Sequence, residues 1–329
     1  MSEQPAAAPS QRQIVENLLR NSPFDIGGEI LEQREIYRQM MSGLPVPDDV
    51  TARPGELGGV PVVTFTTHVA APDMILLYLH GGAYAFGAAR DAAGLACGLA
   101  RPARATVVSV DYRLAPEHPF PAAVDDVVSV YHALRTENPS ATIAFAGESA
   151  GGGLALSTLL ALKESEEPQP AAALLLSPWL DLTVPAQHPA TGTGDMVLTT
   201  EGLRTRALDY LGGADTVPTA VDPLNADLTG LAPLHIQAGS SEILLADALR
   251  LAARAAEAHV QVELRISAHM QHVFHNFAGL LDEADAAIRA AGDFLSTHRP
   301  VPSAPRTPTP DYIKDRREAH RSDGVLGQR

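Results

Sequence analysis

The sequence predicts an α/β protein with a mostly parallel central sheet that helices cover on both faces. Short runs rich in apolar and β-branched residues alternate with longer stretches rich in Ala and Leu, the pattern of repeated strand–helix units. Several of the short runs, such as residues 171–177, are apolar almost throughout, as expected for strands buried on both sides. Of the 329 residues, 45% are hydrophobic and 19% charged, a composition typical of a folded protein and not of a disordered chain.

The chain begins with an Ala- and Pro-rich segment, residues 1–10, that we expect to be loosely ordered. Between residues 11 and 41 the apolar side chains recur at mostly helical spacing. Pro23 and the pair Gly27-Gly28 interrupt this spacing, because both residue types disfavour a helix interior. We therefore interpret residues 11–41 as two helices rather than one.

Strand and helix candidates then alternate along the chain. The strands are expected at residues 60–66, 74–79, 105–111, 142–146, 171–177, 234–238 and 260–267. The helices are expected at residues 88–100, 122–136, 150–166, 243–258 and 283–297. Parallel strands need crossover connections of this kind, so the alternation favours a parallel sheet.

One stretch breaks the alternation. Residues 183–230 are rich in proline around a single helical segment at 200–211, so they form an insertion between two strands. In a parallel sheet such an insertion lies above the carboxyl ends of the strands, where ligands bind. The last segment, residues 299–329, holds five prolines and few apolar residues, and we expect it to be a flexible tail.

The composition excludes several classes of protein. With a formal net charge of −15 the chain would repel a phosphate backbone, so nucleic acid is not an expected partner. The longest apolar runs are far shorter than the roughly 20 residues that span a membrane, and the N-terminus lacks the features of a signal peptide. The single cysteine, Cys97, allows neither an internal disulfide nor a thiolate metal cluster, which fits a reducing compartment. We expect a cytoplasmic protein that does not act at a membrane.

Residues 147–151, Gly-Glu-Ser-Ala-Gly, match the pattern Gly-x-Ser-x-Gly between the expected strand 142–146 and helix 150–166. A serine at such a junction is held on a tight, strained turn, the arrangement called a nucleophile elbow. The small residues at both ends of the motif let the strand and the helix approach closely. An ordinary Gly-rich turn is the alternative, but the strand–turn–helix context favours Ser149 as a nucleophile.

The segment His80-Gly81-Gly82-Ala83-Tyr84 follows directly after the expected strand 74–79. Consecutive glycines place backbone N–H groups in a tight turn, and such donors can hold the negative oxygen of a tetrahedral intermediate. We interpret His80 as a buried residue that shapes the loop rather than as a catalytic one. A hairpin turn and a phosphate-binding turn are the alternatives, and the second would require Lys and Ser or Thr after the glycines.

A nucleophilic serine needs a base, and the base needs an acid that orients it. Three histidines follow the last expected strand, where a loop can bring an imidazole above the sheet: His269, His272 and His275. Their spacing also fits a metal site, the weaker interpretation because a catalytic triad explains their position without a metal. For the acid, Glu242 falls in the loop after strand 234–238, whereas Asp247 would lie inside the following helix. Glu242 is therefore the better candidate, although a helix-start carboxylate that interacts with the helix dipole is an alternative role for it.

Four segments together resemble the hormone-sensitive-lipase branch of the α/β-hydrolases, a group of bacterial carboxylesterases with a His-Gly-Gly-Gly-like motif. These segments are residues 80–84, 111–122 (Asp-Tyr-Arg-Leu-Ala-Pro-Glu-His-Pro-Phe-Pro-Ala), 147–152 and 271–274. The resemblance covers about residues 11–298 and implies an α/β-hydrolase fold. It further implies a cap made of N-terminal helices, residues 1–45, and of the inserted segment, 183–230, on a catalytic domain of residues 46–298, with the tail 299–329 outside.

The family pattern also implies the roles of individual residues. Ser149 is the nucleophile and His272 the base. The oxyanion hole is implied to consist of the backbone N–H groups of Gly81, Gly82 and Ala150. The family usually has an aspartate where Glu242 stands, thirty residues before the histidine, so the extra methylene keeps Asp247 in reserve as the acid.

The resemblance implies a serine carboxylesterase that hydrolyses short- to medium-chain acyl esters through an acyl-enzyme intermediate, with no cofactor and no metal. Two alternatives would use the same triad, namely the hydrolysis of a lactone and the removal of an acetyl group. A further alternative is a non-catalytic ligand receptor on the same fold, which the presence of all three triad candidates disfavours. The expected partner is a small-molecule ester or lactone, and a homodimer is the default assembly.

A few other residues are expected to have structural roles. Glu148, beside the nucleophile, should make structural hydrogen bonds. Arg113 and Glu117 should hold the loop after strand 105–111, and an ion pair between them is one possibility. Trp179 and Asp181 should pack against and cap the end of the strand that precedes them.

Overall fold

The predicted strands assemble into one eight-stranded sheet in the computed structural model, which describes residues 8–44, 46–71, 73–184, 194–214 and 216–299. In chain order the strands are β1 (Thr51–Leu57), β2 (Val60–Thr66), β3 (Met74–Leu79), β4 (Thr106–Val110), β5 (Thr142–Glu148), β6 (Ala173–Leu176), β7 (Leu234–Gly239) and β8 (Val262–Ser267). Their order across the sheet is β1-β2-β4-β3-β5-β6-β7-β8. The strands from β4 to β8 pair in parallel, and only β1 and β2 run antiparallel to their neighbours. The prediction of a mostly parallel sheet is confirmed.

Strand β1 is the one strand that the sequence analysis does not predict. It contains Pro54 and Gly55, and its residues are exposed except for the half-buried Leu57, so it shows no apolar pattern. It forms one edge of the sheet and pairs only with β2. An edge strand tolerates proline because one row of its N–H groups needs no partner, and its formation depends on the neighbouring strand rather than on its own residues.

The helices follow the predicted order with small shifts of their ends. They are α1 (Gln11–Arg20), α2 (Ile30–Ser42), α3 (Ala93–Ala103), α4 (Ala122–Glu137), α5 (Ala150–Glu164), α6 (Thr200–Tyr210), α7 (Leu245–Glu257) and α8 (Asp282–Thr297). The break between α1 and α2 confirms two N-terminal helices. The helix predicted at 88–100 is a short 3₁₀ turn, η1 (Ala89–Ala92), followed by α3. Two further 3₁₀ turns are η2 (Thr219–Val221) and η3 (Phe274–Phe277).

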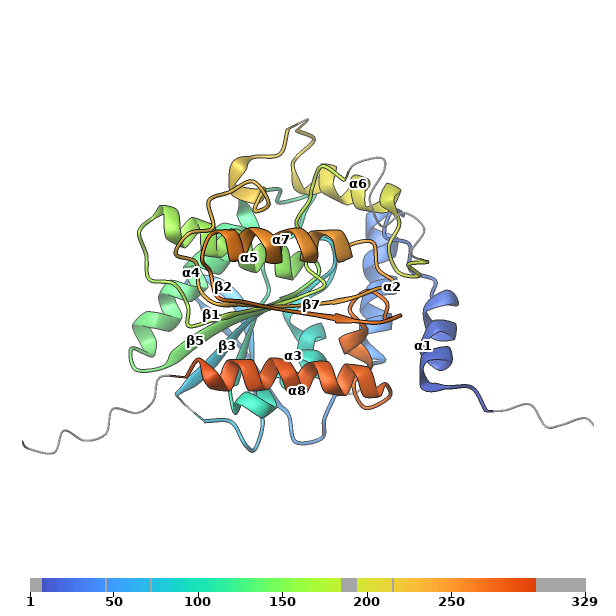
Figure 1. Ribbon diagram of the computed structural model, residues 1–329, viewed down its shortest axis with the longest axis horizontal. Helices are drawn as coiled ribbons and strands as arrows, with labels where there is room; N and C mark the ends of the chain where they lie inside the picture. The colour runs from blue at the N-terminus through green and yellow to red at the C-terminus, as the bar shows by residue number, and fades with distance from the viewer. Residues whose placement is uncertain (1–7, 45, 72, 185–193, 215, 300–329) are drawn as a thin grey trace, which may run out of the picture. The chain divides into compact units, whose positions relative to one another are not determined.

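Helices cover both faces of the sheet, as Figure 1 shows. Helices α4, α5 and α7 pack on one face and α3 and α8 on the other. Alternate side chains of β3 point to the two sides, with Ile75, Leu77 and Leu79 in the first cluster and Met74, Leu76 and Tyr78 in the second. Because both faces are buried, the central strands are apolar without alternation, which explains the sequence pattern.

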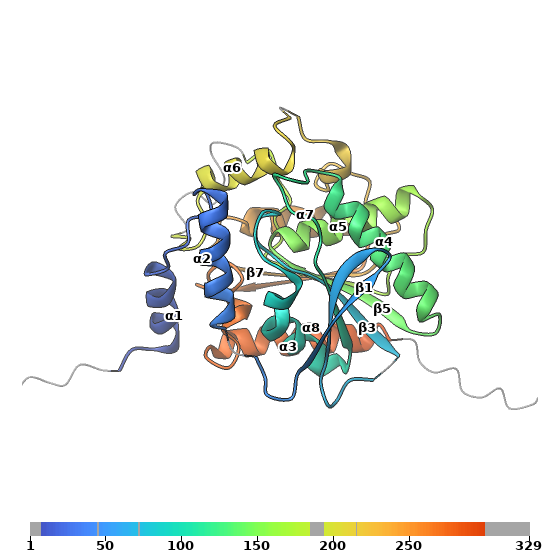
Figure 2. The ribbon, with the colours of Figure 1, turned by 180° about the vertical axis from the view of Figure 1, so that it is seen from behind.

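Helices α1, α2 and α6 lie on the same side of the sheet domain (Figures 1 and 2). The turn between α1 and α2 packs closely on α6, where Gly27 meets Gly202. A Cβ atom on Gly202 would lie 2.3 Å from Cγ2 of Ile26, so this approach requires glycine. The contact brings the two segments predicted to form a cap together, although residues 1–7 and 185–193 of those segments lie outside the described residues.

The described residues up to Arg299 belong to one compact unit. The predicted flexible tail, 299–329, lies outside the described residues apart from Arg299 itself. Within the described part of the chain, no helix combines the length and the apolar character needed to cross a bilayer.

Candidate active site

Ser149 occupies the tight turn between β5 and α5. Its backbone has φ +55° and ψ −122°, a strained conformation for a residue with a side chain. The flanking glycines are needed for the close packing of this turn, since a Cβ on Gly147 would lie 2.3 Å from the carbonyl oxygen of Gly151. A Cβ on Gly151 would in turn lie 2.0 Å from the carbonyl oxygen of Leu79 on β3. The motif residues therefore create the elbow that the sequence pattern predicts.

The three predicted triad residues come together at the carboxyl ends of the strands. His272 lies in the loop after β8, and its Nε2 atom is 2.9 Å from Oγ of Ser149. On the other side of the ring, Nδ1 of His272 is 3.2 Å from Oε2 of Glu242. All three side chains are buried, Glu242 completely. The hydroxyl, the imidazole and the carboxylate are thus arranged as a nucleophile, a base and an orienting acid.

Glu242 lies in the loop between β7 and α7, where no solvent reaches it. Burial raises the pKa of its carboxyl group, while the hydrogen bond with His272 and the side chain of Ser177 act in the opposite direction. Ser177, at the end of β6, is fully buried and has φ +47°. Its hydroxyl oxygen accepts the N–H of Val273, so Ser177 supports the loop that carries His272.

The glycine turn after β3 lies next to Ser149, but its N–H groups are not all available. The N–H of Gly81 donates to Oε1 of Glu148 at 2.7 Å. The structure gives no hydrogen-bond partner within the described residues to the N–H groups of Gly82, Ala83 and Ala150. Gly82 has φ +109° and Ala83 φ +52°, the unusual backbone that turns these groups away from the strand. Ala83 is a candidate donor that the sequence analysis misses, because the backbone direction within a turn depends on φ and ψ.

Glu148 and His80 have the structural roles that the sequence analysis assigns to them. Glu148 is buried and accepts hydrogen bonds from the Tyr78 hydroxyl and from the N–H of Gly81. Burial raises the pKa of Glu148 to about 7. His80 is buried and stacks on Tyr112 with ring centroids 4.3 Å apart, and its Nδ1 lies 2.8 Å from the carbonyl oxygen of Gly81. Both residues therefore shape the turn beside the nucleophile.

A cavity of about 480 Å³ opens above Ser149 and His272. Its walls are mostly apolar, and two of them come from the N-terminal helices and from the part of the inserted segment that precedes α6. Residues of these walls include Leu18, Leu19, Met40, Met41, Val197 and Leu198. Among the described residues that line it there is no lysine or arginine. The cavity is suited to an uncharged, apolar ligand group next to the serine hydroxyl.

Comparisons with known proteins agree with the fold and with the predicted family. The α/β hydrolase fold family matches residues 76–276. An acetyl-hydrolase of Streptomyces hygroscopicus is 36% identical over 297 residues, which cover 88% of this chain and 97% of the relative. The crystal structure of an esterase from the bacterial hormone-sensitive lipase family has a TM-score of 0.84 and 36% identity, covering 90% of this chain and 100% of that chain. This chain belongs to the α/β hydrolases of the hormone-sensitive lipase family.

A third similar protein has a shorter aligned region. An esterase of Acinetobacter venetianus is 34% identical over 268 residues, which cover 80% of this chain and 88% of that protein. The family match over residues 76–276 spans the elbow, the glycine turn and the loops that carry Glu242 and His272. The predicted family membership of this α/β hydrolase is confirmed.

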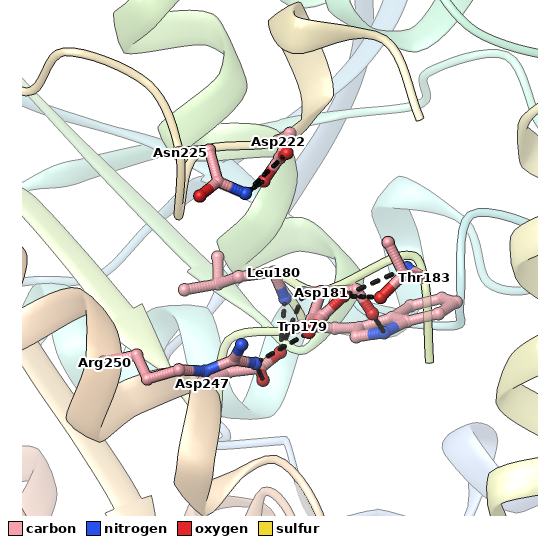
Figure 3. A network of polar contacts seen from close by, with 8 residues as sticks. All are labelled: Trp179, Leu180, Asp181, Thr183, Asp222, Asn225, Asp247 and Arg250. Atoms are coloured by element: carbon pink, nitrogen blue, oxygen red, sulfur yellow. Dashed lines mark hydrogen bonds and ion pairs between the residues drawn. The ribbon is translucent and has the colours of Figure 1, made fainter. Parts of the chain in front are cut away.

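The second acidic candidate of this α/β hydrolase, Asp247, has another environment (Figure 3). It lies on α7, and its Oδ2 atom accepts the N–H groups of Leu180 and Asp181 at 2.8 and 3.0 Å. Arg250 forms ion pairs with the carboxylates of Asp247 and Asp181. Its Nη2 atom lies 2.7 Å from Oδ1 of Asp247 and 2.9 Å from Oδ2 of Asp181. Asp247 thus holds the segment after β6, as Figure 3 shows, while the carboxylate beside His272 is that of Glu242.

The three histidines of the 269–275 segment do not converge in this α/β hydrolase. His269 is exposed, and His275 is fully buried with its Nε2 atom 2.9 Å from Oε1 of Gln237. Burial lowers the pKa of His275 to about 3. Only His272 reaches Ser149. Among the described residues, no three side chains of His, Cys, Asp or Glu are grouped as metal ligands would be.

The ion pair considered between Arg113 and Glu117 does not form, because each residue binds another partner. Arg113 forms an ion pair with Asp126 on α4, in which Nη2 of Arg113 lies 2.8 Å from Oδ1 of Asp126. Glu117 instead binds Arg34 of α2 at 2.7 Å. Sequence distance favoured the near pair, but the loop direction turns the two side chains toward different helices. Arg34 is consequently a residue that the sequence analysis misses, and it fastens an N-terminal helix to the loop after β4.

Proposed function

We propose that this chain is a carboxylic ester hydrolase that uses Ser149 as its nucleophile and acts on short- to medium-chain acyl esters through an acyl-enzyme. One observation carries the proposal: Ser149 Oγ lies 2.9 Å from His272 Nε2 at the base of an apolar cavity. Glu242, 3.2 Å from Nδ1, completes the arrangement. The relatives named as an acetyl-hydrolase and an esterase support hydrolysis of esters.

In the first half of the reaction, His272 accepts the proton of Ser149 through Nε2 as Oγ attacks the ester carbonyl carbon. The new C–O bond gives a tetrahedral intermediate with a negative oxygen. When the bond to the leaving oxygen breaks, His272 returns the proton to it and the alcohol departs. Glu242 accepts the Nδ1–H of His272, so Nε2 is kept free to take the proton.

In the second half, water attacks the acyl carbon of the ester formed on Ser149 while His272 takes one of its protons. The second tetrahedral intermediate collapses with release of the carboxylic acid. The proton then passes from His272 back to Oγ of Ser149, and the enzyme regains its starting state.

We assign the oxyanion hole to the N–H groups of Gly82, Ala83 and Ala150. Gly82 and Ala150 keep the roles that the family resemblance implies. Ala83 replaces Gly81, because the N–H of Gly81 donates to Glu148 in the ground state. Backbone donors fixed in this way act without reorganisation when the negative charge develops on the carbonyl oxygen, which is why they lower the barrier.

The test is hydrolysis of p-nitrophenyl esters from acetyl to dodecanoyl by the full chain and by Ser149→Ala. We expect activity to be highest for short and medium acyl groups and to fall by about 10⁴-fold or more in the variant. Ser157→Ala is the matched control, since Ser157 is a buried serine of α5, the helix that follows Ser149, and it lies outside the cavity.

The outcomes separate the candidate activities. Substantial activity of Ser149→Ala would show that another group is the nucleophile. If the folded wild-type chain cleaves no linear ester, a panel of lactones follows, because a cyclic ester would use the same triad and the cavity walls decide between the two substrate classes.

A further inference from the structure

Asp195 connects the inserted segment to the loop of the proposed catalytic acid. Its Oδ1 atom accepts the N–H groups of Val197 and Leu198 at 2.8 and 2.9 Å. Its Oδ2 atom accepts the N–H of Ile243 at 2.8 Å. Ile243 directly follows Glu242 and is buried. One half-buried carboxylate therefore holds both a turn of the inserted segment and the acid's loop.

Gln271 makes the corresponding connection to the loop of the proposed base. It directly precedes His272 and is buried. Its Oε1 atom accepts the N–H of Met196 at 3.0 Å, and its Nε2 atom lies 3.5 Å from the carbonyl oxygen of Gly194. The four-residue stretch 195–198 is thus hydrogen-bonded to the neighbours of two of the three triad residues.

The same stretch forms part of the cavity wall. Val197 and Leu198 line the cavity above Ser149, and Leu198 is buried. Helix α6 begins directly afterwards, with Thr199 as its N-cap, and packs on the turn that contains Ile26. A displacement of residues 195–198 would therefore move the wall relative to the serine, and it would also release the two triad loops.

We propose that Asp195 and Gln271 are positioning residues that couple the Val197–Leu198 wall to the loops of Glu242 and His272, so that turnover and chain-length selectivity depend on the same contacts. This inference rests on the proposed function, because it takes Glu242 and His272 as the acid and the base. Neither residue touches the reacting atoms. Their effect comes from placement, to which catalysis is sensitive at the level of 1 Å.

Asp195→Asn separates the two functions of the carboxylate. The amide oxygen of asparagine can still accept from Val197 and Leu198, but its NH₂ group then faces the N–H of Ile243, donor against donor. We measure kcat and KM with two ester series, one lengthening the acyl chain and one the alcohol. The expected result is a fall in kcat of about 10- to 100-fold with every ester, since the acid's loop is released.

The selectivity should change as well. In one of the two series the variable chain contacts the Val197–Leu198 wall. For that series we define the selectivity ratio as kcat/KM of the six-carbon ester divided by kcat/KM of the two-carbon ester. This ratio should fall about fivefold in Asp195→Asn, since the long chain loses its fixed contact. Asp227→Asn is the matched control in the same inserted segment. Its exposed carboxylate binds the half-buried Lys163 and lies away from the cavity, so kcat and the selectivity ratio should both stay within about twofold of the wild type.

Gln271→Met is the second variant; it removes the acceptor for the N–H of Met196 and the weak donor to the carbonyl oxygen of Gly194. It should lower kcat and the selectivity ratio in the same direction as Asp195→Asn but less, and it provides the test if Asp195→Asn does not fold by circular dichroism. An equal fall with all chain lengths in both series, or unchanged kinetics, overturns the coupling. Failure of the proposed function would appear separately, as activity retained in Ser149→Ala.

Discussion

At the scale of single residues, neighbouring side chains on one turn have different tasks. Ser149 faces the cavity and His272, whereas Glu148 faces the interior and holds the Tyr78 hydroxyl and the Gly81 N–H. Glu148 is the last residue of β5 and Ser149 begins the turn with a positive φ, so the two neighbours have different partners. A carboxyl group buried in this position must affect the pH dependence of stability.

Glu148 should make the wild-type protein less stable as the pH rises. Its pKa is about 7 in the folded state against 4.5 ordinarily, so the folded state keeps a proton that the unfolded chain releases. The free energy of unfolding therefore decreases with rising pH between about 4.5 and 7, by about 3 kcal/mol for this group. Glu148→Gln, which resembles the protonated acid, should remove that decrease. Urea unfolding at pH 5, 6, 7 and 8 measures it.

The measured quantity is the difference in the free energy of unfolding between the wild type and Glu148→Gln at each pH, because the contributions of the other titrating groups cancel in that difference. Glu164→Gln at the exposed end of α5 is the control, and its stability should parallel that of the wild type at every pH. Curves of Glu148→Gln and the wild type that stay parallel from pH 5 to 8 would contradict the prediction.

At the scale of elements, the N-terminal helices depend on a few polar anchors. Arg34 of α2 donates to the carbonyl oxygens of Ala85 and Ala115 at 2.8 and 2.9 Å and binds Glu117. These partners belong to the segments that follow β3 and β4. Helix α2 is thereby fixed against the turn that carries the proposed oxyanion donors, and its residues line the cavity.

Arg34→Met should lower the free energy of unfolding by about 2 kcal/mol, because two partly buried carbonyl groups lose their donor. It should also raise KM, since α2 contributes to the cavity wall. Arg38→Met is the control on the same helix. Arg38 pairs with Glu35 one turn away, and both are exposed, so its loss should cost less than about 0.5 kcal/mol. Equal effects of both substitutions in urea unfolding would contradict the anchoring role.

At the scale of the whole molecule, charge restricts the substrate. The chain carries a formal net charge of −15, and no lysine or arginine is among the described residues of the cavity wall. An anionic group on a substrate would meet repulsion on approach and would lose water in the cavity without gaining a lysine or arginine partner among the described lining residues. A neutral ester meets neither obstacle.

Mono-p-nitrophenyl adipate and p-nitrophenyl hexanoate have acyl chains of equal length and differ in a terminal carboxylate. We expect kcat/KM for the adipate to be at least about 100-fold lower, which corresponds to about 2.7 kcal/mol for an unpaired charge. Added salt should reduce the difference only in part, because it screens long-range repulsion but not desolvation. Comparable rates for the two esters would show that a cation reaches the acyl end.

The sequence by itself determined the elements and the positions of the chemistry. Runs of apolar and β-branched residues marked the strands from β2 to β8, and burial on both faces explains the near-continuous apolar runs of the central strands β3 to β6. The motif around Ser149 marked the elbow, because only small residues permit the turn. Strand β1 escaped detection, since its pairing with β2 and not its own side chains makes it a strand. A local sequence pattern predicts an element when the residues of that element themselves cause it to form.

The tertiary structure alone decided which partners meet. It placed Glu242 rather than Asp247 beside His272, gave the N–H of Gly81 to Glu148, paired Glu117 with Arg34, and joined Asp195 to the loop that carries Glu242. In each case several carboxylates or donors stand at suitable distances along the chain. The choice among them depends on loop directions that the packing of distant elements determines, and no local pattern contains that information.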